Sequence, residues 1–449
     1  MPPSAAPNVH QGTEPAPSPT DYSFNPSVTS FRLDNGLRVV VLPDMRSEAV
    51  NHMVWYRNGS IDDPAGKSGI AHFLEHLMFK GTPRFPAEAF RKTISRSGGA
   101  YNAFTGPSMT CYFETVTADI LPKCMAFEAD RMANLQFGAE AASTERDVIL
   151  AERGMTIEAN PGRLLDEKMI AAVFGSAPEG RPVIGWRHEI EGLTHDDARA
   201  HYESFYAPEN ALLLVAGGVD PDEVRDLAIA TYGAVPARAV KRRERSVFPP
   251  LAAEMVEVQH PDVRSPEARR AFRVPCGSAA DRSLASAFRL IAFYLSGTES
   301  GHLMRVLGGT RQVASTASSA YVTEVFPDET LFLVSASPTD TVSIDTLEQE
   351  LDALLGELAQ SGIPDDALAR CKRHSEARSM FGLDNLRSLS HYFGSMLTLG
   401  QPVEEIVQWQ HRLQAVTPAD IRRAAALLSP ARAVRARLLP GSATAPLGA

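Results

Sequence analysis

The sequence predicts an α+β protein with largely antiparallel sheets, and three observations support this. Predicted strands and helices occur in groups rather than in β-α-β alternation, which favours separate layers over a parallel sheet. The 449 residues exceed what one core usually serves, so two domains of about 200 residues each are expected. With 44% hydrophobic and 22% charged residues, the chain has the composition of a globular protein.

The first half is expected to begin with a β-hairpin. Residues 31–33 and 37–42 are rich in β-forming residues and flank Asp34-Asn35-Gly36, where the Asn-Gly pair tolerates the positive φ of a tight turn. Periodicity and turn residues then predict, in order, a strand over 52–57, a polar loop over 58–69, a helix over 70–79, a helix over 86–96, strands over 101–105 and 109–117, and helices over 119–137 and 141–159.

A break in composition separates the two halves. Residues 237–250 carry the charge run from Lys241 to Arg245, followed by Phe248-Pro-Pro, and we interpret them as a solvated linker rather than a binding patch. Beyond it the order repeats coarsely: a strand near 272, a helix from 281, a short helix near 303, strands to about 336 and helices to the end. Length and element order suggest that the halves share one fold, although no residue-level repeat proves it.

The expected organisation is a flexible tether over 1–27, an N-terminal half over 28–236, the linker over 237–250, a C-terminal half over 251–440 and a tail over 441–449. The tether is rich in Pro, Ala and Ser and lacks the apolar core of a signal peptide. Because such stretches often follow a removed export signal, we expect a periplasmic location, with the cytoplasm as the alternative.

Composition excludes several functional classes. A formal net charge of -10 argues against a general nucleic-acid binder. No apolar run is long enough for a membrane-spanning helix. The four cysteines are widely separated, so we expect buried free thiols rather than disulfides or a thiolate metal site.

The segment 69–81 contains the candidate chemistry. His72 and His76 are four residues apart, so they lie on one face of the predicted helix and can share a metal ion. Glu75 lies beside them, close enough to act as the base toward a metal-held water. This H-x-x-E-H pattern is the inverted zincin signature, and it predicts a hydrolytic zinc site. Either histidine alone would be an ordinary core or surface residue, and the pattern alone also occurs by chance.

A catalytic zinc usually has three protein ligands, so a third must come from elsewhere. Glu152 is the candidate, on the helix predicted over 141–159. Glu145 lies seven residues earlier, two turns away on the same face, where it can hydrogen-bond a ligand histidine. Without the histidines, both glutamates would read as a solvated acidic face.

At this point the sequence resembles the pitrilysin family of zinc peptidases, an inverzincin family that includes insulysin and the mitochondrial processing peptidase. The similar segments are the Leu33–Val41 stretch, Gly59-Ser60 with Asp63-Pro-Ala-Gly66, the H-x-x-E-H helix, Gly98–Thr105 and Glu145–Glu152. The 76 residues from His76 to Glu152 (152 − 76 = 76) also match the family's spacing.

The resemblance implies two related α/β-roll halves, one zinc ion per chain and an endopeptidase that cleaves unfolded peptides inside a chamber formed by two such chains or halves. Family members bind peptides by adding a strand to a sheet edge. The matching edge here is Asn102, Ala103, Phe104 and Thr105.

One departure from the family concerns the partner. Members with a complete site carry an arginine and, four residues on, a tyrosine that steady the substrate carbonyl. Here Arg311 matches, but Ser315 stands at the tyrosine position. We therefore expect this chain alone to be poorly active and to work in a hetero-oligomer with a sister subunit that supplies the pair. Arg311 as a plain surface cation remains the alternative.

Two competing interpretations stay open. The chain could be a non-catalytic assembly subunit of the same fold, although the intact set of His72, Glu75, His76 and Glu152 argues against this. A metal-dependent hydrolase acting on a non-peptide substrate has the same ligands. The strand-like segment beginning at Asn102 favours peptides.

Overall fold

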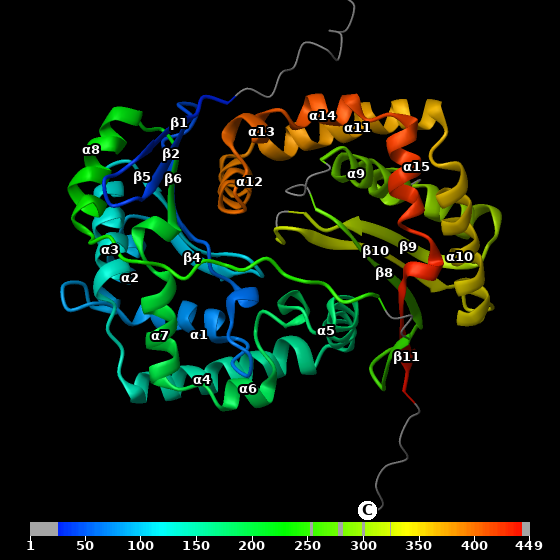
Figure 1. The fold of residues 1–449 in the computed structure, drawn as a ribbon, viewed down its shortest axis with the longest axis horizontal. Coiled ribbons are helices and arrows are strands. Elements are labelled where there is room, and N and C mark those ends of the chain that lie inside the picture. Colours follow the sequence, from blue (N-terminus) through cyan, green and yellow to red (C-terminus); the bar gives the residue numbers. More distant parts are fainter. Residues whose placement is uncertain (1–25, 252–254, 277–281, 299–300, 324, 442–449) are drawn as a thin grey trace, which may run out of the picture.

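The structure, a computed structural model, describes residues 26–251, 255–276, 282–298, 301–323 and 325–441. The predicted tether over 1–27 and tail over 441–449 lie almost wholly outside these residues. Figure 1 shows one sheet with its helices on one side of the molecule and a second sheet with its helices on the other. The predicted α+β class is confirmed.

The first sheet, within the described residues, has six strands in the order β1-β2-β6-β3-β5-β4. All its pairs are antiparallel except β2 with β6, and β4 forms one edge. The bounds are β1 (Thr29–Arg32), β2 (Arg38–Pro43), β3 (Ala49–Tyr56), β4 (Ala100–Thr105), β5 (Thr110–Thr117) and β6 (Ala211–Gly217).

The helices of the first half, apart from α5, pack on one face of this sheet or against one another. Their bounds are α1 (Ile70–Leu77), α2 (Ala87–Arg96), α3 (Leu121–Asn134), α4 (Ala139–Arg153), α5 (Pro161–Phe174), α6 (Arg187–Glu191), α7 (His195–Phe205) and α8 (Pro221–Thr231). The predicted helix over 70–79 ends earlier as an α-helix and continues as a 3₁₀ turn, Met78–Lys80.

The second sheet repeats the topology of the first. Its strands follow the order β7-β11-β8-β10-β9, with β7 and β11 parallel and the other pairs antiparallel, which reproduces β2-β6-β3-β5-β4. The bounds are β7 (Met255–His260), β8 (Glu267–Pro275), β9 (Ala314–Tyr321), β10 (Glu329–Pro338) and β11 (Val434–Pro440). The two halves therefore share one fold.

The helices of the second half are α9 (Arg282–Ser296), α10 (Ile344–Ser361), α11 (Asp365–Leu383), α12 (Leu386–Thr398), α13 (Val403–Val407), α14 (Trp409–Ala415) and α15 (Pro418–Ala426). The short helix predicted near 303 is a π-helical turn, Met304–Thr310. Among the described residues, none of the helices combines the length and apolar character needed to span a bilayer. The four cysteines are buried, as expected, and no disulfide links them.

The halves exchange helices. α5 packs on β7, β8 and β11 of the second sheet, with Leu165 and Met169 in a core that includes Ala271. In return, α12 packs on β3 and β6 of the first sheet. Strand β6 is therefore buried along its full length, because α1 and its neighbours cover one face and the second half covers the other. Each sheet depends on a helix from the other half of the chain.

The linker is partly a structural element. Residues 237–250, all described, run without a helix or strand, and Arg242 and Arg245 are exposed as expected. Arg243 contradicts the interpretation of a purely solvated charge run. Its guanidinium donates to both carboxylate oxygens of Asp62, whose side chain is 3% exposed, and, over 2.7 Å, to the carbonyl of Ser108.

The contact between α12 and β3 generates a stability prediction. A Cβ on Gly394 would lie 2.2 Å from Cε2 of Trp55, so Gly394→Ala forces overpacking between the halves and should cost about 1–3 kcal/mol of unfolding free energy. Gly356→Ala is the matched control, because a Cβ on Gly356 in α10 meets nothing within 4 Å. Relief of the glycine's chain entropy should stabilise this control by about 0.4–1 kcal/mol. Urea unfolding measures the free energy of unfolding of both variants. Equal changes in the two variants would contradict the close packing of Gly394 against Trp55.

Candidate metal centre

Helix α1 starts at a defined point because its first turn is capped. The carboxylate of Asp63 accepts the backbone N–H groups of Gly69 (2.7 Å) and Ala71 (3.2 Å), which would otherwise lack acceptors. Gly69 has φ of +88°, and a Cβ there would lie 2.5 Å from the carbonyl oxygen of Ile184. Glycine at 69 and aspartate at 63 thus fix where the helix begins and which way its faces point.

Three potential ligand atoms converge at this helix. The carboxylate oxygen Oε2 of Glu152 lies 3.8 Å from Nε2 of His72 and 3.6 Å from Nε2 of His76. All three donor atoms lie within 4.8 Å of one another. Zinc bonds of about 2.0–2.1 Å at tetrahedral angles separate ligand atoms by roughly 3.4 Å, so this set fits a zinc ion with little adjustment.

The protonation of His72 and the contacts of His76 also fit a metal. Burial, followed by the charge of His76, lowers the pKa of His72 to about 3, so its imidazole is neutral at physiological pH and offers a lone pair. Nδ1 of His76 contacts Oε1 of Glu145 at 2.9 Å, and Lys80 pairs with the other oxygen of that carboxylate. Glu145 therefore holds His76 with Nε2 turned toward Glu152, the arrangement that supports a ligand imidazole.

Glu75 takes no part in this cluster. Its carboxylate is only 8% exposed and accepts a hydrogen bond of 2.6 Å from Oγ1 of Thr105 on β4. Burial raises the pKa of Glu75, and the hydrogen bond from Thr105 opposes that rise. A buried carboxylate outside the ligand set, next to it in sequence, is suited to accept a proton.

The cluster opens into a cleft of about 810 Å³. Ala103, Phe104 and Thr105 line it together with Glu75 and the three donor residues, and so do residues of α5 and Phe326 from the second half. Asn102, on the same strand, is exposed and is not among the described lining residues. No sequence pattern predicted the walls that α5 and Phe326 contribute, because both depend on contacts between the two halves of the chain.

Arg311 lies apart from this cleft. Its guanidinium pairs with the carboxylates of Glu350 (2.9 Å) and Glu357 (2.8 Å) on α10, and Arg311 is not among the described residues that line the cleft. The hydroxyl of Ser315 donates to the carbonyl of Pro338 over 2.9 Å. Within one chain, therefore, the side chains of Arg311 and Ser315 do not reach the three potential metal-ligand atoms.

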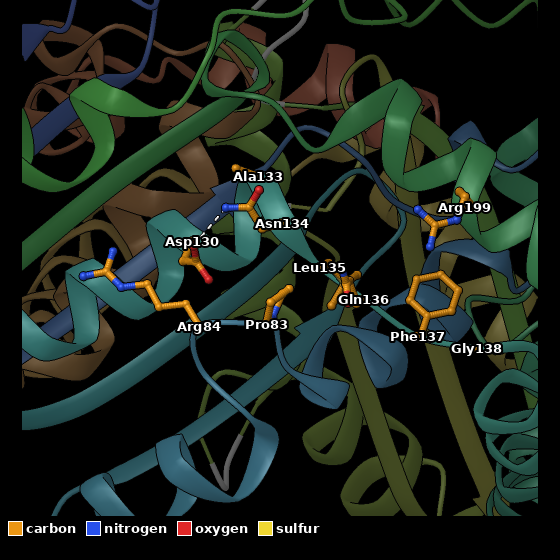
Figure 2. A pocket seen from close by; sticks show the side chains of 10 residues that line it. All are labelled: Pro83, Arg84, Asp130, Ala133, Asn134, Leu135, Gln136, Phe137, Gly138 and Arg199. Carbon is orange, nitrogen blue, oxygen red and sulfur yellow. Dashed lines mark hydrogen bonds between the residues drawn. The ribbon is translucent and has the colours of Figure 1, made fainter.

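A second hollow, of about 910 Å³, is lined by the C-terminal end of α3, residues 135–138 and Arg199 of α7, and its described lining includes none of the predicted site residues. Figure 2 shows Asn134 hydrogen-bonded to Asp130, and the guanidinium of Arg199 beside the ring of Phe137. Asp130 also accepts from Thr82. Among the described residues, the cluster of three potential metal donors lies at the cleft and not at this hollow.

Two family profiles and several curated relatives match the chain over most of its length. The profile of the insulinase family (peptidase family M16) matches residues 38–186, and that of the M16 inactive domain matches residues 192–374. An uncharacterized zinc protease of Mycobacterium leprae is 30% identical over 417 residues, covering 89% of this chain and 91% of the relative. Zinc protease PqqE of Helicobacter pylori is 27% identical over 90% of each chain.

Solved structures show the same fold. A protease from Helicobacter pylori superposes with a TM-score of 0.82 at 25% identity, over 92% of this chain and 100% of that one. The periplasmic protease PqqL from Escherichia coli superposes with a TM-score of 0.77 at 21% identity, over 93% of this chain and 48% of PqqL. The profiles span both halves and the relatives match nearly end to end, which confirms the resemblance seen in the sequence. The chain belongs to the M16 (insulinase) family of peptidases.

Proposed function

We propose that this chain is a zinc-dependent endopeptidase with His72, His76 and Glu152 as metal ligands and Glu75 as the catalytic base. The observation that carries the proposal is the convergence of three donor atoms beside a buried carboxylate that is not one of them. The zinc-protease names of the relatives support the choice of metal and the reaction class.

The residues divide the chemistry between them. A bound zinc ion would supply Lewis acidity and lower the pKa of a water molecule. Glu75 takes the proton of the attacking water and delivers it to the leaving amine, which requires a carboxylate free of the metal. Glu145 keeps the imidazole of His76 in the orientation that ligation needs.

The substrate would be an unfolded peptide bound as an added strand. β4 is the edge of the first sheet, so no described strand pairs with the outer side of Asn102 to Thr105. The Ala103 N–H donates to Oδ1 of Asn102 over 2.9 Å, a local contact that an added peptide strand would replace. Because this pairing uses main-chain groups, peptides with many different side chains could bind. Ala103 and Thr105 line the cleft with Glu75, which supports a binding mode in which such a peptide lies beside the base.

The proposed function also includes a partner subunit. Arg311 is engaged by α10, and Ser315 lacks the phenol that would steady a substrate carbonyl. We infer a hetero-oligomeric chamber in which a sister chain supplies an arginine and tyrosine. A substrate role for Arg311 itself stays a prediction, and so does the periplasmic location, for which the support is the fold shared with the periplasmic PqqL.

The metal assignment predicts a separation of zinc content from activity. Wild type should carry one zinc per chain, and His76→Ala should lose it. Glu75→Gln should keep the zinc while kcat for a quenched fluorescent peptide falls by about 10²–10⁴-fold, because only the proton acceptor is removed. Metal analysis measures the zinc content of each variant, and cleavage of the fluorescent peptide measures kcat. A wild type without zinc would instead support a non-catalytic assembly subunit.

The contact between Glu145 and His76 predicts a weaker metal site when it is lost. Glu145→Ala should reduce zinc affinity by about 10- to 100-fold, measured by competition with a chelator, because the imidazole is no longer held. Glu140→Ala is the control, since Glu140 lies in the first turn of the same helix and is exposed. Equal affinities of the two variants would rule out a supporting role.

The partner proposal predicts low activity of the isolated chain. Without the missing donor, kcat should lie about 10²–10³-fold below that of the native assembly. The test compares the tagged chain purified alone with the complex recovered from its native cells. Full activity of the chain alone would contradict the need for a sister subunit.

A further inference from the structure

We propose that Thr105 is a positioning residue: its hydroxyl fixes the Glu75 carboxylate, and because Thr105 ends the strand to which a peptide would pair, it links peptide binding to the orientation of the base. This inference deepens the proposed function and rests on it. It assigns the Thr105 side chain a role separate from main-chain pairing.

The first observation is that Glu75 depends on Thr105. Among the described residues, the only hydrogen bond to the Glu75 carboxylate is the one from Oγ1 of Thr105, at 2.6 Å. The side chain of Glu75 is buried, so water does not replace that donor freely. A glutamate has three rotatable side-chain bonds, and a single short hydrogen bond therefore selects the direction of its carboxylate.

The second observation is that Thr105 is itself held in place. The turn after β4 is tied to the segment at residues 59–61: Ser60 N–H donates to the Gly106 carbonyl (3.2 Å) and Ile61 N–H to the Pro107 carbonyl (3.0 Å). A Cβ on Gly59 would lie 2.3 Å from the Gly106 oxygen, so this close approach requires glycine. The end of β4 is therefore fixed before any peptide arrives.

The neighbouring strand holds Thr105 as well. Thr105 pairs with Thr110 in the register of β4 and β5. Thr110 is fully buried, and its hydroxyl donates to the carbonyl of Asn58 over 2.8 Å. Oγ1 of Thr110 also lies 3.4 Å from Oγ1 of Thr105, whereas Oε2 of Glu75 lies only 2.6 Å from it, so the Thr105 hydroxyl donates to the nearer carboxylate.

The third observation places this contact at the substrate edge. Thr105 is the last residue of the edge strand, and its side chain and that of Glu75 line the same cleft. A peptide paired to β4 would lie along Thr105, which already touches the base. Loss of the hydroxyl should therefore disturb the direction of Glu75 while the main-chain groups that bind the peptide stay intact.

Thr105→Val tests this, because valine keeps the β-branched shape and removes the hydroxyl. We expect kcat to fall by about 10- to 100-fold with KM within about twofold of wild type and zinc content unchanged. Thr105→Ser, which retains the hydroxyl, should restore most of kcat. Thr117→Val on β5, whose hydroxyl bonds the exposed Asp119, is the matched control and should behave as wild type.

A second measurement needs no zinc or turnover. In metal-free protein, Thr105→Val should lower Tm when Glu75 is present, because a buried carboxylate loses its donor, and should not lower it in a Glu75→Leu background. An equal change in Tm with Glu75 present and with Glu75→Leu would show that Thr105 and Glu75 do not interact. Cleavage that is lost equally in Thr105→Val and Thr105→Ser, or a change confined to KM, overturns the positioning role. If the wild-type protein binds no zinc and cleaves no peptide, the proposed function fails. The Tm comparison still tests the contact between Thr105 and Glu75 separately, because it needs neither zinc nor turnover.

Discussion

The site depends on one constraint, the direction in which α1 leaves the first sheet. With 3.6 residues per turn, His72 and His76 share a face while Glu75 points about 100° away from His76. The histidines therefore meet Glu152 and Glu145 on α4, whereas Glu75 meets Thr105 on β4. The Asp63 carboxylate and Gly69 fix the start of the helix, so a small rotation there would separate both sets of contacts.

The duplicated topology explains how such a site can be held rigidly. Each half contributes one helix that packs on the sheet of the other half. Helix α5 covers the second sheet and lines the cleft, and α12 covers the face of the first sheet opposite α1. Arg243 of the linker ties Asp62 to the turn after β4. The first half carries the donor cluster, and in the second half Arg311 is occupied by carboxylates of α10.

Local patterns predicted a large part of this molecule. Periodicity and turn residues located most strands and helices of the first half to within a few residues, because these signals act over short stretches. The spacing of His72, Glu75 and His76 predicted their geometry, since one helix contains them. The reciprocal placement of α5 and α12 was not predicted, because it depends on contacts between residues far apart in the chain. The Arg243 ion pair and the hydrogen bond from Thr105 to Glu75 were missed for the same reason.

The most direct test of the account is anomalous diffraction at the zinc absorption edge from crystals of the protein grown with zinc. The account predicts one peak per chain within bonding distance of Nε2 of His72, Nε2 of His76 and a carboxylate oxygen of Glu152, with Glu75 outside bonding distance and still hydrogen-bonded to Thr105. A peak elsewhere, no peak, or Glu75 bound directly to the metal would contradict it.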